Sequence, residues 1–166
     1  MKSFRHRRPS LPALALLIAV AGCSSSDDSA ATAVPSPDTE VTELCQNLDK
    51  ALPREVAGVE RRDPEPRSAL TAGWGNPAII LRCGVVRPPR MTDPDVAQGR
   101  DPDAVAGGVN GVDWLQEDVG DGAFRFTTAN RRAYVEVTVP GGRDGAAVLV
   151  DLAAAVKKAI PEGIAD

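Results

Sequence analysis

The sequence predicts an α+β domain of two layers, a mainly antiparallel sheet with an N-terminal and a C-terminal helix packed on one face. Two segments with helical spacing of apolar residues, 41–52 and 146–160, enclose the region between them. That region contains short apolar or alternating segments of the kind that form strands, at 56–61, 78–86, 112–116, 124–127 and 134–139. Runs of strands bounded by helices are typical of this class.

The first helix is predicted from an amphipathic stripe and from its end signals. Asp38 or Thr39 can cap its start, and Pro53 stops it. The apolar positions of the stripe are Val41, Leu44, Cys45, Leu48 and Leu52. Cys45 is therefore expected to face the core.

The segment 78–86 predicts a central strand, because it is apolar, rich in β-branched residues and followed by two prolines. Side chains alternate along a strand, so Cys83 shares a face with Leu81 and Val85. Both Cys45 and Cys83 thus point toward the region where helix packs on sheet.

Cys45 and Cys83 form an even pair, which outside the cytoplasm predicts a disulfide. A free pair or a metal site is the alternative, although two thiolates without histidine are too few for zinc. Closing this loop is expected to contribute about 3–4 kcal/mol in the chain-entropy model.

The rest of the domain is predicted from strand alternation and a second helical stripe. The segments 124–127 and 134–139 predict a hairpin, and 146–160 predicts the C-terminal helix with Pro161 after it. Residues 88–110 are expected to be a long loop. The arginines of the hairpin are expected on a solvated face: Arg125, Arg131 and Arg132.

The N-terminus carries the pattern of an exported lipoprotein. Residues 1–22 contain four basic residues and no acidic one, and an apolar stretch of about ten residues follows the charges. Val20-Ala21-Gly22-Cys23 resembles a lipobox, which predicts cleavage before Cys23 and lipidation of its thiol. A plain secretory signal with an incidental cysteine is the alternative. Arg7-Arg8 suggests twin-arginine export, but the neighbouring prolines favour the general route.

Removal of residues 1–22 would leave a lipidated Cys23, a tether and one domain. Residues 24–39 are mostly Ser, Ala, Asp and Pro, so we expect a flexible tether with a reach of about 20 Å. The domain spans 40–166 and is expected at the cell membrane, held by lipid on the extracytoplasmic side. Residues 23–166 carry 15 basic and 23 acidic residues, and a net charge of −8 argues against nucleic-acid partners.

Several chemistries are excluded by composition. The single histidine, His6, lies in the predicted signal peptide, so the domain has no histidine for a catalytic dyad or triad. Phosphate-loop, dinucleotide and zinc motifs are absent from the sequence, and we expect no cofactor or metal. Four acids of the 88–110 loop could bind calcium, but the EF-hand pattern is broken and a solvated acidic loop is favoured: Asp93, Asp95, Asp101 and Asp103.

Trp74, Arg82 and Trp114 are the candidates for a binding surface. The alternative for the tryptophans is a place at the edge of the core. Arg82 lies in the middle of an apolar strand and alternates with Cys83, so it is expected on the open side of the sheet. Glu136 is its candidate partner, in which case Arg82 is structural.

Four blocks of the sequence carry a resemblance to a known family. They are Leu44-Cys45 with Leu52-Pro53, the stretch from Trp74 to Val85, Gly111-Val112-Asp113-Trp114, and Phe126-Thr127-Thr128. Together they resemble an uncharacterised actinobacterial family of exported and membrane-anchored proteins, catalogued as domain-of-unknown-function family 3515. The resemblance covers about residues 41–160. It implies an envelope location and a paired Cys45 and Cys83, and it implies no activity.

Two functions follow as hypotheses. The first is a non-catalytic module that binds or scaffolds an envelope protein or a cell-wall component. The second is a small-ligand binder or a hydrolase that uses carboxylates in a cleft, acting on envelope material. A pocket that collects carboxylates would favour the second.

Overall fold

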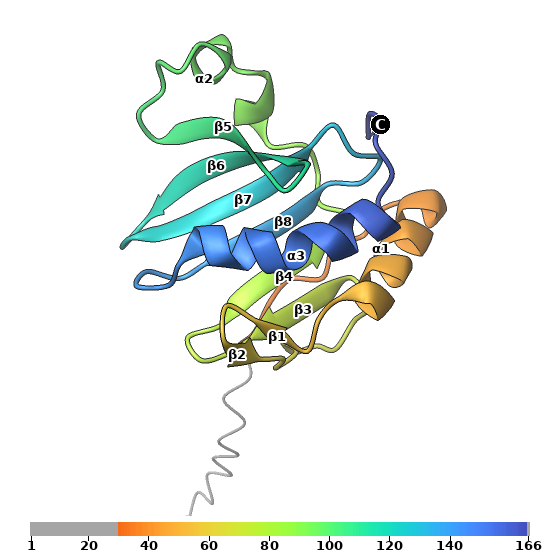
Figure 1. Cartoon of the computed structure of the whole chain (residues 1–166). Helices are drawn as coiled ribbons and strands as arrows, with labels where there is room; N and C mark the ends of the chain where they lie inside the picture. The colour runs from red at the N-terminus through yellow and green to blue at the C-terminus, as the bar shows by residue number, and fades with distance from the viewer. Residues whose placement is uncertain (1–29, 166) are drawn as a thin grey trace, which may run out of the picture.

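A computed structural model describes residues 30–165 of the chain. The predicted signal peptide, which includes His6, and the predicted lipidation site Cys23 lie outside these residues. The described part is an antiparallel six-stranded sheet with helices α1 and α3 packed side by side on one face, which confirms the predicted α+β class (Figure 1).

The elements follow one another in a simple order. Helix α1 (Thr39–Ala51) leads into two short strands, β1 (Glu55–Val56) and β2 (Val59–Glu60). Strands β3 (Thr71–Trp74) and β4 (Ile79–Cys83) come next, then a 3-10 turn η1 (Pro89–Thr92) and the short helix α2 (Pro94–Ala97). Strands β5 (Ala104–Val109), β6 (Val112–Gly120), β7 (Ala123–Ala129) and β8 (Val135–Val139) precede helix α3 (Gly145–Ala159).

The strand order in the main sheet is β3-β4-β8-β7-β6-β5. Strand β4 is an inner strand, as its apolar sequence predicts. The predicted hairpin is also confirmed, since β7 pairs with β8 and Thr127 lies opposite Glu136.

Both long helices begin and end where the sequence predicts. The carboxylate of Asp38 accepts a hydrogen bond from the Val41 amide at 2.9 Å, and Asp144 accepts one from the Ala147 amide at 3.2 Å. These side chains satisfy backbone donors that have no partner within the helix.

The predictions for the connecting segments were wrong in two places and missed one strand. Residues 56–61 are not one strand but the hairpin β1–β2, because Ala57 and Gly58 take left-handed backbone angles that reverse the chain. Residues 88–110 are not a loop throughout, since they contain η1, α2 and β5. Strand β3, which ends at Trp74, is not among the predicted strands.

The hydrophobic core lies between the sheet and the two long helices. Valines of β8 and the stripe of α3 fill most of it, and the side chains of Trp74 and Leu48 are fully buried there. We call this side of the sheet the helix face and the opposite side the open face.

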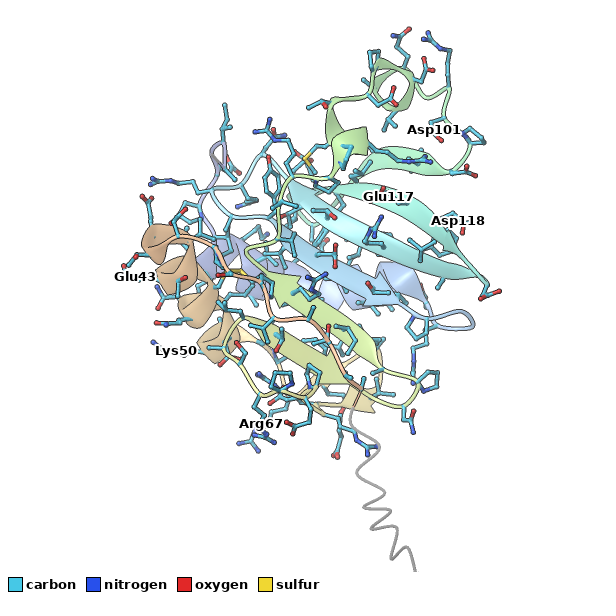
Figure 2. The ribbon with its side chains drawn as sticks, turned by 180° about the vertical axis from the view of Figure 1, so that it is seen from behind. Glu43, Lys50, Arg67, Asp101, Glu117 and Asp118 are labelled. Atoms are coloured by element: carbon cyan, nitrogen blue, oxygen red, sulfur yellow. A yellow bond between two sulfur atoms is a disulfide. The ribbon has the colours of Figure 1, made fainter. Side chains whose placement is uncertain are left out.

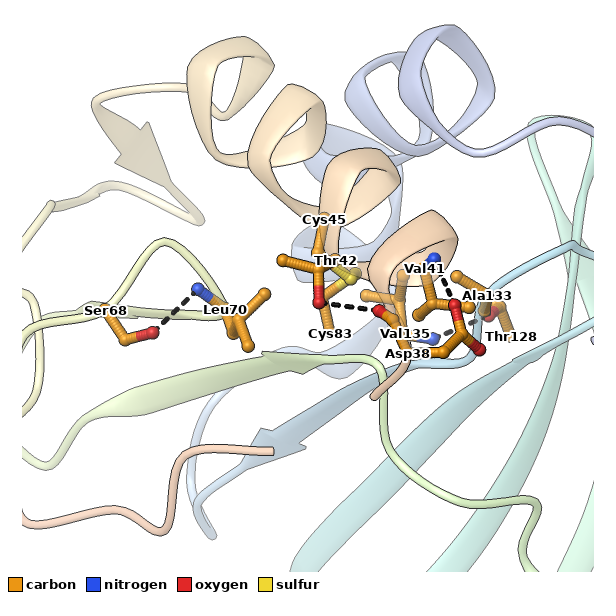
Figure 3. Close-up of a disulfide and its surroundings, with 10 residues drawn as sticks. All are labelled: Asp38, Val41, Thr42, Cys45, Ser68, Leu70, Cys83, Thr128, Ala133 and Val135. Atoms are coloured by element: carbon orange, nitrogen blue, oxygen red, sulfur yellow. Dashed lines mark hydrogen bonds between the residues drawn. A yellow bond between two sulfur atoms is a disulfide. The ribbon is translucent and has the colours of Figure 1, made fainter. Parts of the chain in front are cut away.

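The disulfide between Cys45 and Cys83 joins α1 to β4 across this core (Figure 3). The two Cα atoms are 5.5 Å apart, and both residues are buried. The prediction of a bridge where helix packs on sheet is confirmed.

Replacing Cys45 and Cys83 together with alanine should lower the free energy of unfolding by about 3–4 kcal/mol, because the unfolded chain regains the entropy of an open loop. Urea unfolding followed by circular dichroism measures the change. The wild type in strong reductant is the matched control and should unfold at a similar urea concentration. An unchanged midpoint in the variant would contradict the role assigned to the bridge.

Candidate functional site

The structure does not bring Trp74, Arg82 and Trp114 together on one surface. The two tryptophans are 0% and 2% exposed and lie on the helix face, whereas Arg82 lies on the open face. The physical reason is register, because Trp74 and Arg82 occupy alternating faces of paired strands. The predicted three-residue surface is therefore corrected to a single exposed member, Arg82.

The indoles serve the core. Trp74 donates its Nε1 hydrogen to the carbonyl of Pro53 at 3.1 Å, which ties β3 to the end of α1. Trp114 Nε1 is buried and has no hydrogen-bond partner among residues 30–165.

The open face carries a row of alternating charges that crosses four strands and reaches η1. Its members, in spatial order, are Arg82, Glu136, Arg125, Glu117, Arg90 and Asp101. We call this set the charged row, and Figure 2 shows the face on which it lies.

Strand register explains the row. Arg82 of β4 lies directly opposite Glu136 of β8, and their side chains meet with Nη1 and Oε1 at 3.1 Å. Arg125 of β7 lies opposite Glu117 of β6, with Nε and Oε2 at 3.1 Å. Opposite charges that face each other across strands stabilise a sheet. The predicted pair of Arg82 and Glu136 is confirmed, and so is the placement of Arg82 away from the helices.

Glu117 is the most buried carboxylate of the row, with a side chain that is 8% exposed. It also lies 3.9 Å from Nε of Arg90, so two guanidinium groups hold one carboxylate. The hydrogen bond to Glu117 raises the pKa of Arg125 above its ordinary value, although burial opposes this shift.

A groove of about 810 Å³ lies over the charged row. Its floor contains the paired side chains of Arg82, Glu136, Arg125 and Glu117. One wall is the segment 35–38 and the other is the segment 84–89, in which Val86 is 87% exposed. The groove thus combines a charged floor with proline-rich and apolar rims.

The first wall comes from the end of the predicted tether. Ala31 pairs with Glu65, and the carbonyl of Ala33 accepts a hydrogen bond from Arg82 Nε at 3.0 Å. Pro37 packs so closely on Gly84 that a Cβ there would lie 2.6 Å from it. Residues 30–38 are therefore docked on the domain, which corrects the prediction of a tether that is flexible as far as residue 39.

The second wall is fixed by Arg87. Its Nε donates to the hydroxyl of Tyr134 at 2.7 Å, and its Nη2 donates to the carbonyl of Ala165 at 3.1 Å. Its guanidinium also lies 5.8 Å from the centre of the Tyr134 ring. This wall thus holds the C-terminal segment against β8.

Two arginines expected on a solvated face have structural contacts instead. Arg125 forms part of the groove floor, and Arg131 is 5% exposed and donates to the carbonyls of Ile160 and Gly111. Arg125 is held by Glu117 of the neighbouring strand, and Arg131 by carbonyl groups of two other segments. These contacts depend on the tertiary structure and cannot be predicted from the alternation of residues along one strand.

The acids of the 88–110 region hold local structure. Asp93 caps α2, Asp95 pairs with Arg100, and Asp101 both pairs with Arg90 and accepts the amide of Asp103. Within residues 30–165 no three His, Cys, Asp or Glu residues are arranged to hold a metal ion.

The acidic side chains that line the groove already have partners. Both carboxylates of the floor are held by guanidinium groups, and Asp38 caps α1. Both cysteines of the domain are joined in the disulfide. The fold and groove define an α+β domain with a paired, charged cleft on an open sheet face.

The chain belongs to the family described as "Protein of unknown function (DUF3515)", which matches residues 10–165. This is the family that the four sequence blocks resemble. No curated protein and no solved structure matches the chain. None of the helices in the described residues is long and apolar enough to cross a membrane.

Arg82→Ala should lower the free energy of unfolding by about 1–2 kcal/mol, because it removes the pair with Glu136 and the bond to Ala33. Thermal and urea unfolding measure the loss. A double-mutant cycle with Glu136→Gln should give a coupling of about 0.5–1 kcal/mol. Arg67→Ala, at an exposed position, is the matched control and should change stability by less than about 0.5 kcal/mol. Additive effects in the cycle would show that the pair contributes nothing.

Proposed function

We propose that this protein is a lipoprotein of the cell envelope and that its domain is a non-catalytic binding or scaffolding module. Cys23 carries the lipid, and the domain acts on the outer face of the cytoplasmic membrane. Its partner is an envelope protein or a cell-wall component that enters the groove on the open face. The observation that carries the binding role is this groove, with its fully paired charged floor and its apolar rims.

The proposed location rests on the sequence and is supported by one structural feature. Basic residues, a short apolar stretch, small residues and Cys23 follow one another in the order that lipoprotein export requires. Disulfides persist in oxidising compartments, and the domain contains a buried one.

The binding role is better supported than hydrolysis. A carboxylate hydrolase needs a general acid or base that can exchange a proton with its substrate. Glu117 and Glu136 both reach the groove, but each already accepts hydrogen bonds from an arginine. A ligand that carries charge of both signs could exchange contacts with this floor, since such a row offers donors and acceptors in alternation.

Cys23→Ala should release the protein from the membrane without unfolding its domain, because the lipid is the proposed anchor and Cys23 precedes the domain in the sequence. Fractionation of cells into membrane and soluble material measures the release. The matched control is Ser24→Ala, which should stay with the membrane. If the cysteine variant also stayed there, residues 11–22 would have to act as an uncleaved anchor.

A photoreactive phenylalanine analogue at Val86, on the rim of the groove, should give a discrete adduct on illumination of native membranes. The same analogue at Val150, on the outer side of α3 and 47% exposed, is the control and should not give that adduct. Arg125→Gln in the Val86 background should reduce the adduct several-fold, because it removes one charge from the floor while Arg90 still faces Glu117. Two results would argue against the groove as the binding site. One is an equal yield of the adduct from the analogue at Val86 and at Val150, and the other is a yield that Arg125→Gln leaves unchanged.

A further inference from the structure

The two edges of the main sheet differ in how they are protected. The outer edge of β3 is covered, because the amide of Arg62 donates to the carbonyl of Gly73 at 2.7 Å and the amide of Gly75 donates to Glu60 at 3.0 Å. The other edge is β5. Exposed edges are templates for pairing with another chain, and proteins usually block them with charge, proline or a covering segment.

Strand β5 lacks the usual protection. Its sequence, Ala-Val-Ala-Gly-Gly-Val, contains neither charge nor proline. Residues 105–108 are exposed, and the side chain of Val105 is half exposed. Helix α2 lies beside the start of the strand, where Ala104 packs against Val96.

The pairing with β6 determines which backbone groups of β5 point outward. Val109 and Val112 close a two-residue turn through Asn110 and Gly111, and the amide of Asp118 donates to Asp103 at 2.8 Å. Odd-numbered residues of β5 therefore bond to β6, and the even-numbered ones face away from the sheet. The outward amides and carbonyls of Ala106 and Gly108 have no backbone partner among residues 30–165.

We propose that β5 is a dimerisation edge that pairs in antiparallel fashion with β5 of a second copy of this chain. Pairing centred on Ala106 places Val105 of each copy opposite Gly107 of the other. The branched side chain of Val105 then lies beside Gly107, which has no side chain. No charged side chain of either strand opposes another, and the two sheets join into one.

Charges beside the strand favour a second copy over an unrelated segment. The side chain of Lys157, on α3, lies next to Gly111, just after the end of β5. Asp103 lies just before its start and shares the helix face with Val105, because the two are separated by one residue. Antiparallel pairing brings Lys157 of each copy toward Asp103 of the other, so one interface gains two opposite-charge contacts.

The dimer would leave the rest of the molecule free. The two-fold axis of such a pair is perpendicular to the sheet, so both copies present their open faces in the same direction. The groove lies over β4, β6, β7 and β8, away from the outer edge of β5. The inference therefore stands apart from the binding role proposed above.

Sedimentation equilibrium of the full chain in density-matched detergent tests the proposal. The wild type should be a dimer that dissociates on dilution. Ala106→Lys should raise the dissociation constant at least about a hundredfold, because it places two like charges opposite each other on the axis. Val86→Lys, at an exposed position after β4, is the control for the added charge. Three strands separate β4 from β5, so this change should leave the dimer unchanged.

A charge exchange makes the test specific to this geometry. Lys157→Glu should weaken the dimer about tenfold, and adding Asp103→Lys should restore it. Lys158→Glu, the neighbouring position directed toward α1, should have no effect. A monomeric wild type, a dimer that survives Ala106→Lys, or a failure of Asp103→Lys to restore it would each overturn the proposal.

Discussion

The alternation of side chains along β4 is the constraint on which the rest of the structure depends. Leu81 and Cys83 point into the core, where Cys83 is bonded to α1, and Arg82 between them points to the open face. A shift of one residue in the pairing with β8 would bury a guanidinium and expose a disulfide. The disulfide on the helix face and the pair of Arg82 with Glu136 on the open face therefore both require the same register of β4 against β8.

This constraint explains which parts of the molecule were predictable from sequence. Helices α1 and α3 and strands β4, β7 and β8 each carry their own periodicity, and the capping carboxylates of Asp38 and Asp144 fix the helix ends locally. Strand β5 carries no such signal, because alanine and glycine are poor strand formers. It forms because Asn110 and Gly111 turn the chain back onto β6. The Asn110-Gly111 dipeptide between two valines is the sequence signal from which this hairpin could have been predicted.

The groove could not be predicted because none of its walls is local in sequence. Arg125 meets Glu117 only because β6 and β7 pair, and Arg82 meets Ala33 across 49 positions of the chain. The segment 30–38 has the composition of a flexible linker, yet Pro37 fits the space that Gly84 leaves open. Composition predicts the conformational freedom of an isolated segment, whereas docking depends on the surface beside it.

For the binding role proposed for the groove, the pairing of its charges has a consequence. A ligand that enters must replace contacts that the protein already makes, so its ionic groups add little net free energy. The charges would therefore contribute more to specificity than to affinity. A ligand with the wrong order of charges would leave Glu117 or Arg125 unpaired in a partly buried place. The apolar rim, above all the exposed side chain of Val86, is then the part of the site that can supply binding free energy. The charged floor would select the partner, and the rim would hold it.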